Sequence, residues 1–350
     1  MMQTDFQRAN SQVSRRSHLF GVWLLAVLVL AVLGPRCEAA KTQAPAIADS
    51  FEAFWSEAQN QPFEQQLASW DRWVERPRQD VYTHVVWETD HQPDWRERRL
   101  RQLRQRFADY RQIAARIPPA ARALNAEIPA RVAAFRKLFP DASATPSVQV
   151  LLAPNFDAKS GVLGEGKPVL AFAIDSLLLE HADLDVIFPH ELFHLYHSTH
   201  AGVQNDVVMT GADLTLPLFA EGLATYVSSV IAPEHDDGAL LLQPELASIA
   251  QTRLAELARR FLADADQRAI DHAHPDAFRR WFNAGAARYQ PDLPNRTGYW
   301  LGLAMVRHLR EHHSLRELAS WSPAQAQRQT RAMLVALAGD KPLTHQPTRP

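Results

Sequence analysis

Apolar positions recur at helical spacing over most of this chain, three and four residues apart with polar positions between them. Phe51, Phe54 and Trp55 form one such stripe. The stretch from Asp94 to Arg116 combines an apolar side with an arginine-rich one, and a further helix is expected from Ala120 to Phe139. Downstream, the same periodicity predicts helices over residues 241–263, 277–284, 298–311 and 323–337.

Strand-like patterns are confined to one region of the sequence. Val148 to Ala153 and Pro168 to Ile174 are short, nearly continuous apolar runs, which are typical of buried strands. The Asn, Asp and Gly residues between them predict a turn-rich loop. The expected fold class is therefore α+β, mostly helical, with a small mixed sheet.

One apolar segment carries polar residues with chemical potential. His190 and His194 are four residues apart, so on a helix both imidazoles lie on one face and can bind one metal ion. Glu191 is placed to reach a water on that metal and not the metal itself. In apolar surroundings these groups are costly to bury unless they are paired or bind a metal. The pattern predicts a zinc site with Glu191 as the catalytic base.

A catalytic zinc usually has three protein ligands, and two residues compete for the third place. Glu221 begins an apolar, helix-compatible run, and the small Gly222 beside it would allow close approach of two helices. His200 has the ligand spacing of the metzincin pattern, in which Met209 would belong to the following turn. That pattern requires Gly where this chain has His197. The mismatch favours Glu221, and His200 stays open as the alternative.

Two segments, Phe188–His194 and Phe219–Val227, resemble an uncharacterised bacterial family of predicted zinc-dependent proteases in the gluzincin group. Members carry His-Glu-x-x-His, then Glu-Gly-x-Ala-x-Tyr, then a Gly-Tyr-x-x-Gly helix, which Gly298–Gly302 matches. The resemblance covers roughly residues 145 to 340. It implies a small mixed sheet next to the active-site helix and a helical C-terminal part. It also implies a base at Glu191 and zinc ligands at His190, His194 and Glu221.

The resulting hypothesis is hydrolysis of peptide bonds. Zinc lowers the pKa of a bound water to roughly 7, and the glutamate base takes a proton and returns it to the leaving amine. The developing negative charge needs a hydrogen-bond donor, for which Tyr299 is the first candidate, with Tyr226 and His197 behind it. Thr225 and Asp213 are weaker candidates to orient a zinc-bound imidazole.

The expected substrate is a peptide or protein, which can add a strand to the edge of a sheet. Val169 to Ala173 precedes the predicted zinc helix and is expected to be that edge strand. Two rivals remain, a zinc hydrolase acting on other amides or esters and an exported, non-proteolytic binding or chaperone-like protein with a structural zinc. The intact Glu191 argues against a purely structural site. A net charge of −2 gives no reason to expect nucleic acid as a partner.

The N-terminus has the layout of a secretory signal peptide. Arginines precede an apolar run from Leu19 to Leu33, and the small residues Ala39 and Ala40 offer a cleavage site. The run is shorter than the about 20 residues that a membrane span needs, which favours cleavage. An uncleaved anchor over residues 19–34, the only expected membrane contact, is the alternative. The protein is therefore expected to be exported, periplasmic or secreted.

These observations predict a linear organisation of the chain. The expected parts are a signal peptide or N-terminal anchor (1–40), a helical N-terminal region (41–145), a zinc-binding catalytic core (146–230), a helical C-terminal region (231–340) and a disordered tail (341–350).

Overall fold

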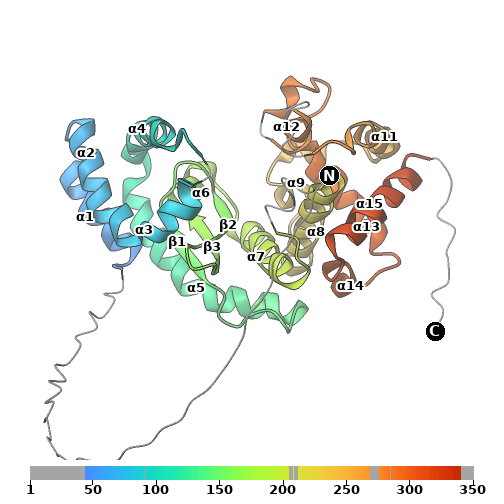
Figure 1. Ribbon diagram of the computed structural model, residues 1–350, viewed down its shortest axis with the longest axis horizontal. Helices are drawn as coiled ribbons and strands as arrows, with labels where there is room; N and C mark the ends of the chain where they lie inside the picture. The colour runs from blue at the N-terminus through green and yellow to red at the C-terminus, as the bar shows by residue number, and fades with distance from the viewer. Residues whose placement is uncertain are drawn as a thin grey trace, which may run out of the picture. The chain divides into compact units, whose positions relative to one another are not determined.

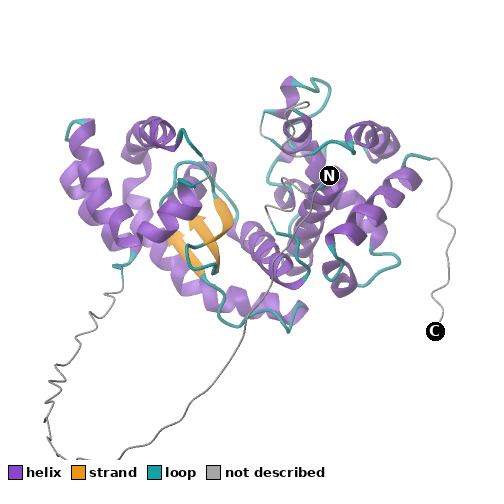
Figure 2. Cartoon of the chain, in the orientation of Figure 1, coloured by secondary structure: helices purple, strands orange, loops and turns teal. Residues whose placement is uncertain are grey.

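The computed structural model consists mostly of helices, with one three-stranded sheet (Figures 1 and 2). This confirms the expected α+β class. The structure describes residues 44–90, 92–204, 208, 212–268, 276–283 and 285–339. The predicted signal peptide, the expected C-terminal tail and Met209 lie outside the described residues.

The chain divides after Gln43, so that all described residues belong to one unit, Ala44–Pro350. The boundaries expected within this unit, near residues 145 and 230, stay predictions. None of the helices in the described part of the chain is both long and apolar enough to cross a membrane.

The N-terminal helices enclose an aromatic core. Phe51 and Phe54 of the first helix are buried, with ring centroids 5.2 Å from Tyr110 and 5.3 Å from Trp70 respectively. Phe51 and Phe54 of the predicted aromatic stripe therefore belong to the core, and Trp55 packs against it partly buried. The helices of this part are α1 (Ile47–Ala58), α2 (Phe63–Trp70), the single turn α3 (Gln79–Val81), α4 (Trp95–Ile113) and α5 (Ile117–Leu138).

Helix α5 begins earlier than its sequence suggests. Pro118 and Pro119 were expected to lie before the helix, but they lie in its first turn. Proline is accepted there because the first backbone N–H groups of a helix have no partner within it.

The sheet contains a strand that its sequence does not reveal. Its strand order is β1 (Val148–Leu151), β3 (Pro168–Ala173), β2 (Ala158–Val162), with β1 parallel and β2 antiparallel to β3. The predicted turn-rich loop thus includes β2, in which only Ala158 is buried, so that no apolar alternation marks it. A turn at Gly166, whose φ of 76° suits glycine, returns the chain to β3.

The expectation that Val169–Ala173 forms the edge of the sheet is wrong. These residues belong to β3, which is the central strand with a partner on each side. The central position of β3 explains its continuous apolar run, because a central strand covered on both faces is buried throughout. Strand β2 is an edge strand of the sheet, and the helix Leu184–His200 packs against it.

Helix α7 (Leu184–His200) packs against β2 and β3 and also against α8 (Thr215–Ile231). Asp183 caps its N-terminus by accepting a hydrogen bond from the backbone N–H of Asp185. Pro189 lies inside the helix, where it removes one backbone hydrogen bond. Ser228 of α8 donates a hydrogen bond of 2.8 Å to the carbonyl of Val186, which ties the two helices together beside this proline.

The remaining helices are α6 (Ile174–Glu180), α9 (Asp237–Leu240), α10 (Pro244–Ala247), α11 (Leu254–Asp264), α12 (Ala277–Phe282), α13 (Thr297–Leu309), α14 (Leu315–Ala319) and α15 (Pro323–Leu337). Helix α8 packs against α7, α13 and α15, whereas α6 packs against α4, α5 and β3. The single helix expected over residues 241–263 is wrong, because Pro244 starts a separate short helix there. The helix expected over 323–337 is confirmed.

Two glycines set the distance between α8 and α13. A Cβ atom on Gly222 would lie 2.4 Å from the carbonyl carbon and oxygen of Gly302, and a Cβ on Gly302 would lie 2.7 Å from the carbonyl oxygen of Leu218. The two backbones therefore touch, which only residues without a side chain permit. This contact explains the glycines at Gly222 and Gly302, since it holds α13 directly against the helix that carries Glu221.

Candidate metal centre

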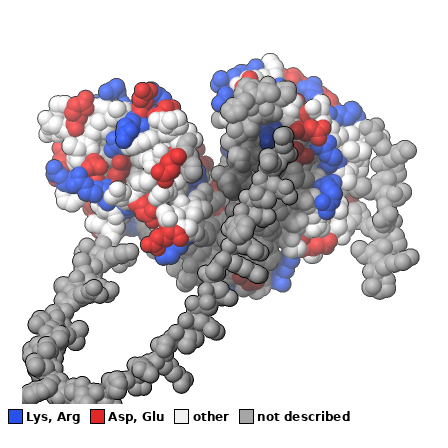
Figure 3. Space-filling view, viewed as in Figure 1, with Lys and Arg blue, Asp and Glu red and all other residues white. Residues whose placement is uncertain are grey.

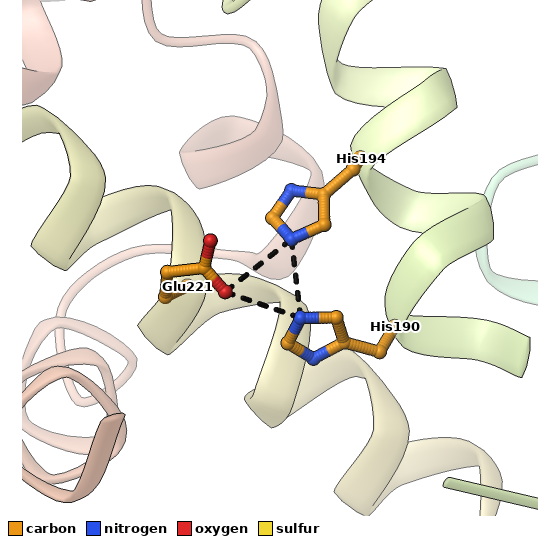
Figure 4. Close-up of side chains that lie close together, drawn as sticks. All are labelled: His190, His194 and Glu221. Carbon is orange, nitrogen blue, oxygen red and sulfur yellow. Dashed lines mark hydrogen bonds and ion pairs between the residues drawn. The ribbon is translucent and has the colours of Figure 1, made fainter. Parts of the chain in front are cut away.

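Helices α7 and α8 bring His190, His194 and Glu221 together (Figure 4). Glu221 Oε2 lies 3.2 Å from His190 Nε2 and 3.5 Å from His194 Nε2, and the two Nε2 atoms are 3.1 Å apart. The side chains are 11%, 19% and 22% exposed for His190, His194 and Glu221, respectively. One atom from each residue is thus aimed at a common, mostly buried point.

This donor set fits a metal ion. The three atoms lie within 4.8 Å of one another and form a group able to hold a metal. For a tetrahedral zinc with Zn–N and Zn–O bonds of about 2.0–2.1 Å, neighbouring donor atoms lie about 3.3 Å apart. The observed spacings of 3.1, 3.2 and 3.5 Å match that edge length. Two imidazoles and one carboxylate leave a fourth position for water or substrate.

The charges of the three residues depend strongly on one another. Burial alone would lower the pKa of His194, but the Glu221 carboxylate raises it to about 9, with a smaller contribution from Glu191. Burial alone would raise the pKa of Glu221, but the two histidines hold it well below its usual range. The carboxylate is therefore ionised, and it attracts a positive charge to the point where the three side chains meet.

Glu191 lines the same pocket, a cavity of about 230 Å³ whose walls also include His194, Glu221 and Tyr299. Burial raises the pKa of Glu191 above its ordinary value, although the positive charges of the two histidines oppose the rise. A carboxylate with a raised pKa takes up a proton more readily than an ordinary one, as a general base must.

Tyr299 is brought into the pocket from α13. Its ring is nearly parallel to that of His190, with an interplanar angle of 27° and centroids 6.4 Å apart. Burial and, next, the Glu221 charge raise the pKa of Tyr299 above its usual range, so its hydroxyl keeps its proton and remains a hydrogen-bond donor. Of the three predicted donor residues, Tyr299 is the one that lines this cavity.

The alternative third ligand, His200, does not join the other two histidines. Helix α7 continues to His200 and does not stop near His197, so the turn that the metzincin pattern requires is not formed. His200 Nδ1 instead lies 3.1 Å from Asp141 Oδ2, and its ring stacks on Tyr196 at 4.8 Å. The structure places it at a different pocket, on another side of α7.

Four weaker expectations are not met by the geometry. His197 is 1% exposed and lies against Phe193 and Phe219, away from the metal pocket. The guanidinium carbon of Arg310 lies over the Tyr226 ring, 5.7 Å from the ring centroid. Thr225 and Asp213 were expected near an imidazole. The Thr225 hydroxyl donates to the backbone carbonyl of Glu221, and Asp213 accepts hydrogen bonds from Thr215 and Arg331.

Sequence reasoning missed residues that line this pocket or contact its walls. Ala158, Lys159 and Ser160 of β2 form one of its walls, and Arg296 contacts Tyr299 from the turn before α13. Neither group has a distinctive sequence signal, because β2 lacks an apolar alternation and Arg296 lies outside the matched motifs.

Comparison with protein-family models, with curated proteins and with solved structures gives no match for this chain. The resemblance to the gluzincin-like family therefore continues to depend on the two sequence motifs, and it stays a prediction.

Proposed function

We propose that this protein is a zinc-dependent metallopeptidase of the gluzincin type. The observation that carries the proposal is the convergence of His190, His194 and Glu221 at tetrahedral spacing, with Glu191 and Tyr299 in the same cavity. A purely structural site would not need an adjacent base with a raised pKa or a tyrosine donor.

The ligands would be His190, His194 and Glu221, and zinc bound to them would activate a water and polarise the scissile carbonyl. Glu191 accepts the proton that the water loses and passes it to the leaving amine. Tyr299 donates a hydrogen bond to the oxygen on which negative charge develops, a contact whose loss typically lowers the rate by about 10²-fold or more.

The edge of β2 is the proposed binding site for an extended peptide. Asp157 and Leu163, which flank β2, form backbone hydrogen bonds toward the β3 side, with Ala173 and Lys167. In an antiparallel pair such residues alternate, so the backbone groups of Ser160 point away from β3. Within the described residues these groups have no backbone partner, and Ser160 itself lines the metal pocket. A substrate strand paired here would pass the metal.

The peptide edge is tested with Ser160→Pro, which removes an outward N–H without removing a bond to β3. We expect a higher KM for a peptide substrate in a folded variant, with kcat changed less. An unchanged KM would reject β2 as the binding strand.

The central test combines metal content with activity. Purified wild type, Glu221→Ala and His200→Ala are analysed for bound zinc, and wild type is compared with Glu191→Gln on an unfolded protein substrate. We expect zinc loss in Glu221→Ala alone, and loss of hydrolysis with retained zinc in Glu191→Gln. Equal hydrolysis by wild type and Glu191→Gln would remove the peptidase proposal, and zinc loss in His200→Ala would favour the metzincin alternative.

The proposal includes export, with the N-terminal segment as a cleaved signal. The face drawn in Figure 3 shows Lys and Arg interspersed with Asp and Glu among the described residues, a mixture that gives no reason to propose nucleic acid as the partner. N-terminal sequencing of the protein from the producing cell tests the cleavage, because a chain that still begins at Met1 would indicate an anchor.

A further inference from the structure

Arg296 occupies a strained position immediately before α13. It is the N-cap residue of that helix and has a left-handed backbone, with φ 60°. This region costs a non-glycine residue on the order of 1 kcal/mol, and such strain is often found at functional sites. The turn is fixed on both sides of Arg296. Asn295 Oδ1 accepts the backbone N–H of Ala287, and the Thr297 hydroxyl donates to the carbonyl of Pro294.

The guanidinium of Arg296 is directed at Tyr299. Its central carbon lies 4.3 Å from the centroid of the phenol ring, a cation–π contact. Among the described residues no carboxylate lies within ion-pair distance of Arg296, although the side chain is half-buried. A partly buried guanidinium usually has a carboxylate partner, so its main contact here is a tyrosine that faces the metal ligands.

Tyr299 needs such a contact because of where it lies. Its ring stands beside His190, and its hydroxyl must reach a substrate oxygen in the neighbouring cavity. A displacement of about 1 Å at a reacting group can lower a rate by about 10²-fold. The planar guanidinium covers one face of the ring, so it restrains the position of the ring and of the hydroxyl that the ring carries.

We propose that Arg296 is a positioning residue that holds the Tyr299 hydroxyl in place for the proposed peptidase reaction. The inference rests on the proposed function. In this role Arg296 does not contact the substrate. Any effect of an Arg296 substitution on the rate should therefore depend on the presence of the Tyr299 hydroxyl.

The main rival role for Arg296 is direct substrate binding. The side chain lines a different cavity from the metal pocket, of about 600 Å³, together with Asp157 and Glu180. A guanidinium that binds substrate there would act independently of the Tyr299 hydroxyl. The two roles therefore differ in whether the effects of substitutions at positions 296 and 299 are additive.

The test is a double-mutant cycle with Arg296→Gly, Tyr299→Phe and the combination, measured as kcat and KM on one peptide. Glycine is chosen because it accepts φ 60° without strain, so the variant keeps the turn. We expect Tyr299→Phe to lower kcat by about 10²-fold. Arg296→Gly should lower kcat by about 10-fold in wild type and by less than about 2-fold in the Tyr299→Phe background. Arg296→Lys should restore part of the loss.

A matched control is Arg288→Ala. The Arg288 guanidinium covers the ring of Tyr289 at 5.9 Å, the same kind of contact on a tyrosine that does not line the metal pocket, and kcat should not change. Zinc content should be the same in all variants. A second measurement is the Kd of a phosphonate peptide analogue, a mimic of the tetrahedral intermediate, which should rise about 10-fold in Arg296→Gly and not in Arg288→Ala.

The outcomes separate this inference from the proposed function. Equal losses from Arg296→Gly in the two backgrounds would overturn the positioning role and indicate direct binding of substrate. A kcat unchanged in Arg296→Gly would overturn it as well. If hydrolysis does not depend on Glu191, the proposed function itself fails, and the inference fails with it.

Discussion

Replacing Gly222 with alanine tests how the site is assembled. The new Cβ would lie 2.4 Å from the carbonyl carbon and oxygen of Gly302, both of them backbone atoms that no rotamer change can move. An ordinary contact needs about 3.4 Å or more, so α13 must shift away from α8 by about 1 Å. Overpacking of this kind costs about 3 kcal/mol, and the better helix propensity of alanine returns about 1 kcal/mol.

The net loss expected for Gly222→Ala is therefore about 2 kcal/mol of unfolding free energy. For a chain of this size that corresponds to a drop in Tm of about 3 °C. The shift also moves Tyr299 away from Glu221, because the two residues lie on the helices that separate. We therefore expect a fall in kcat of about 10- to 100-fold in protein that is still folded.

The assay is thermal unfolding followed by circular dichroism, together with steady-state kinetics well below the measured Tm. Gly238→Ala is the control, since its Cβ would meet a side-chain oxygen of Asp236 at 3.3 Å and no backbone atom closer than 3.4 Å. We expect little change in that variant. A Gly222→Ala protein with wild-type Tm and wild-type kcat would refute the view that the glycine contact sets the position of Tyr299.

Three further predictions concern titratable groups. The Glu221 carboxylate raises the pKa of His194 to about 9, so zinc must displace a proton from this imidazole when it binds. Calorimetry should therefore show a zinc affinity that rises about tenfold per pH unit up to pH about 9 and then becomes constant. A zinc affinity that does not change between pH 6 and pH 8 would contradict this. His197 is buried with no hydrogen-bond partner for either ring nitrogen among the described residues, so His197→Leu should raise the free energy of urea unfolding by about 1 kcal/mol, and a loss of stability would show that the imidazole has a hidden role. The hydrogen bond to Asp183 raises the pKa of His235, so this pair contributes stability fully below pH about 6.5 and loses it as the pH rises through the raised value. Asp183→Asn keeps the helix cap but not the ion pair, and its Tm deficit should be larger at pH 5.5 than at pH 9; an equal deficit at both would assign the effect to the cap alone.

The two histidines of the candidate metal site were predictable because their signal is local. The i, i+4 spacing of His190 and His194 fixes their common face as soon as the segment is helical, whatever surrounds it. The prediction of Glu221 as the third ligand required two further observations, the Glu-Gly-x-Ala-x-Tyr motif and the mismatch of His197 with the metzincin pattern. The helix continues through His197 to His200, and a straight continuation turns the His200 side chain away from the other two histidines.

The errors have a different origin, because they depend on tertiary pairing. Val169–Ala173 has the sequence of a strand, but whether a strand is central or at an edge depends on a partner elsewhere in the chain. That partner, β2, contains Lys159, Ser160 and Gly161, which carry no strand signal and form a strand only by pairing with β3. Arg296 was missed for a related reason, since its contact with Tyr299 depends on the left-handed turn before α13.

The open edge of β2 affects how the protein behaves in concentrated solution. A strand with free backbone groups accepts any extended chain, including a strand or tail of another copy of the same protein. Lys159, which is paired with Glu88 at 2.7 Å, places charge on this strand and opposes such stacking. Each copy that docks there would cover the candidate metal pocket of its neighbour, so the proposed peptidase activity per molecule should fall as the protein is concentrated and return on dilution.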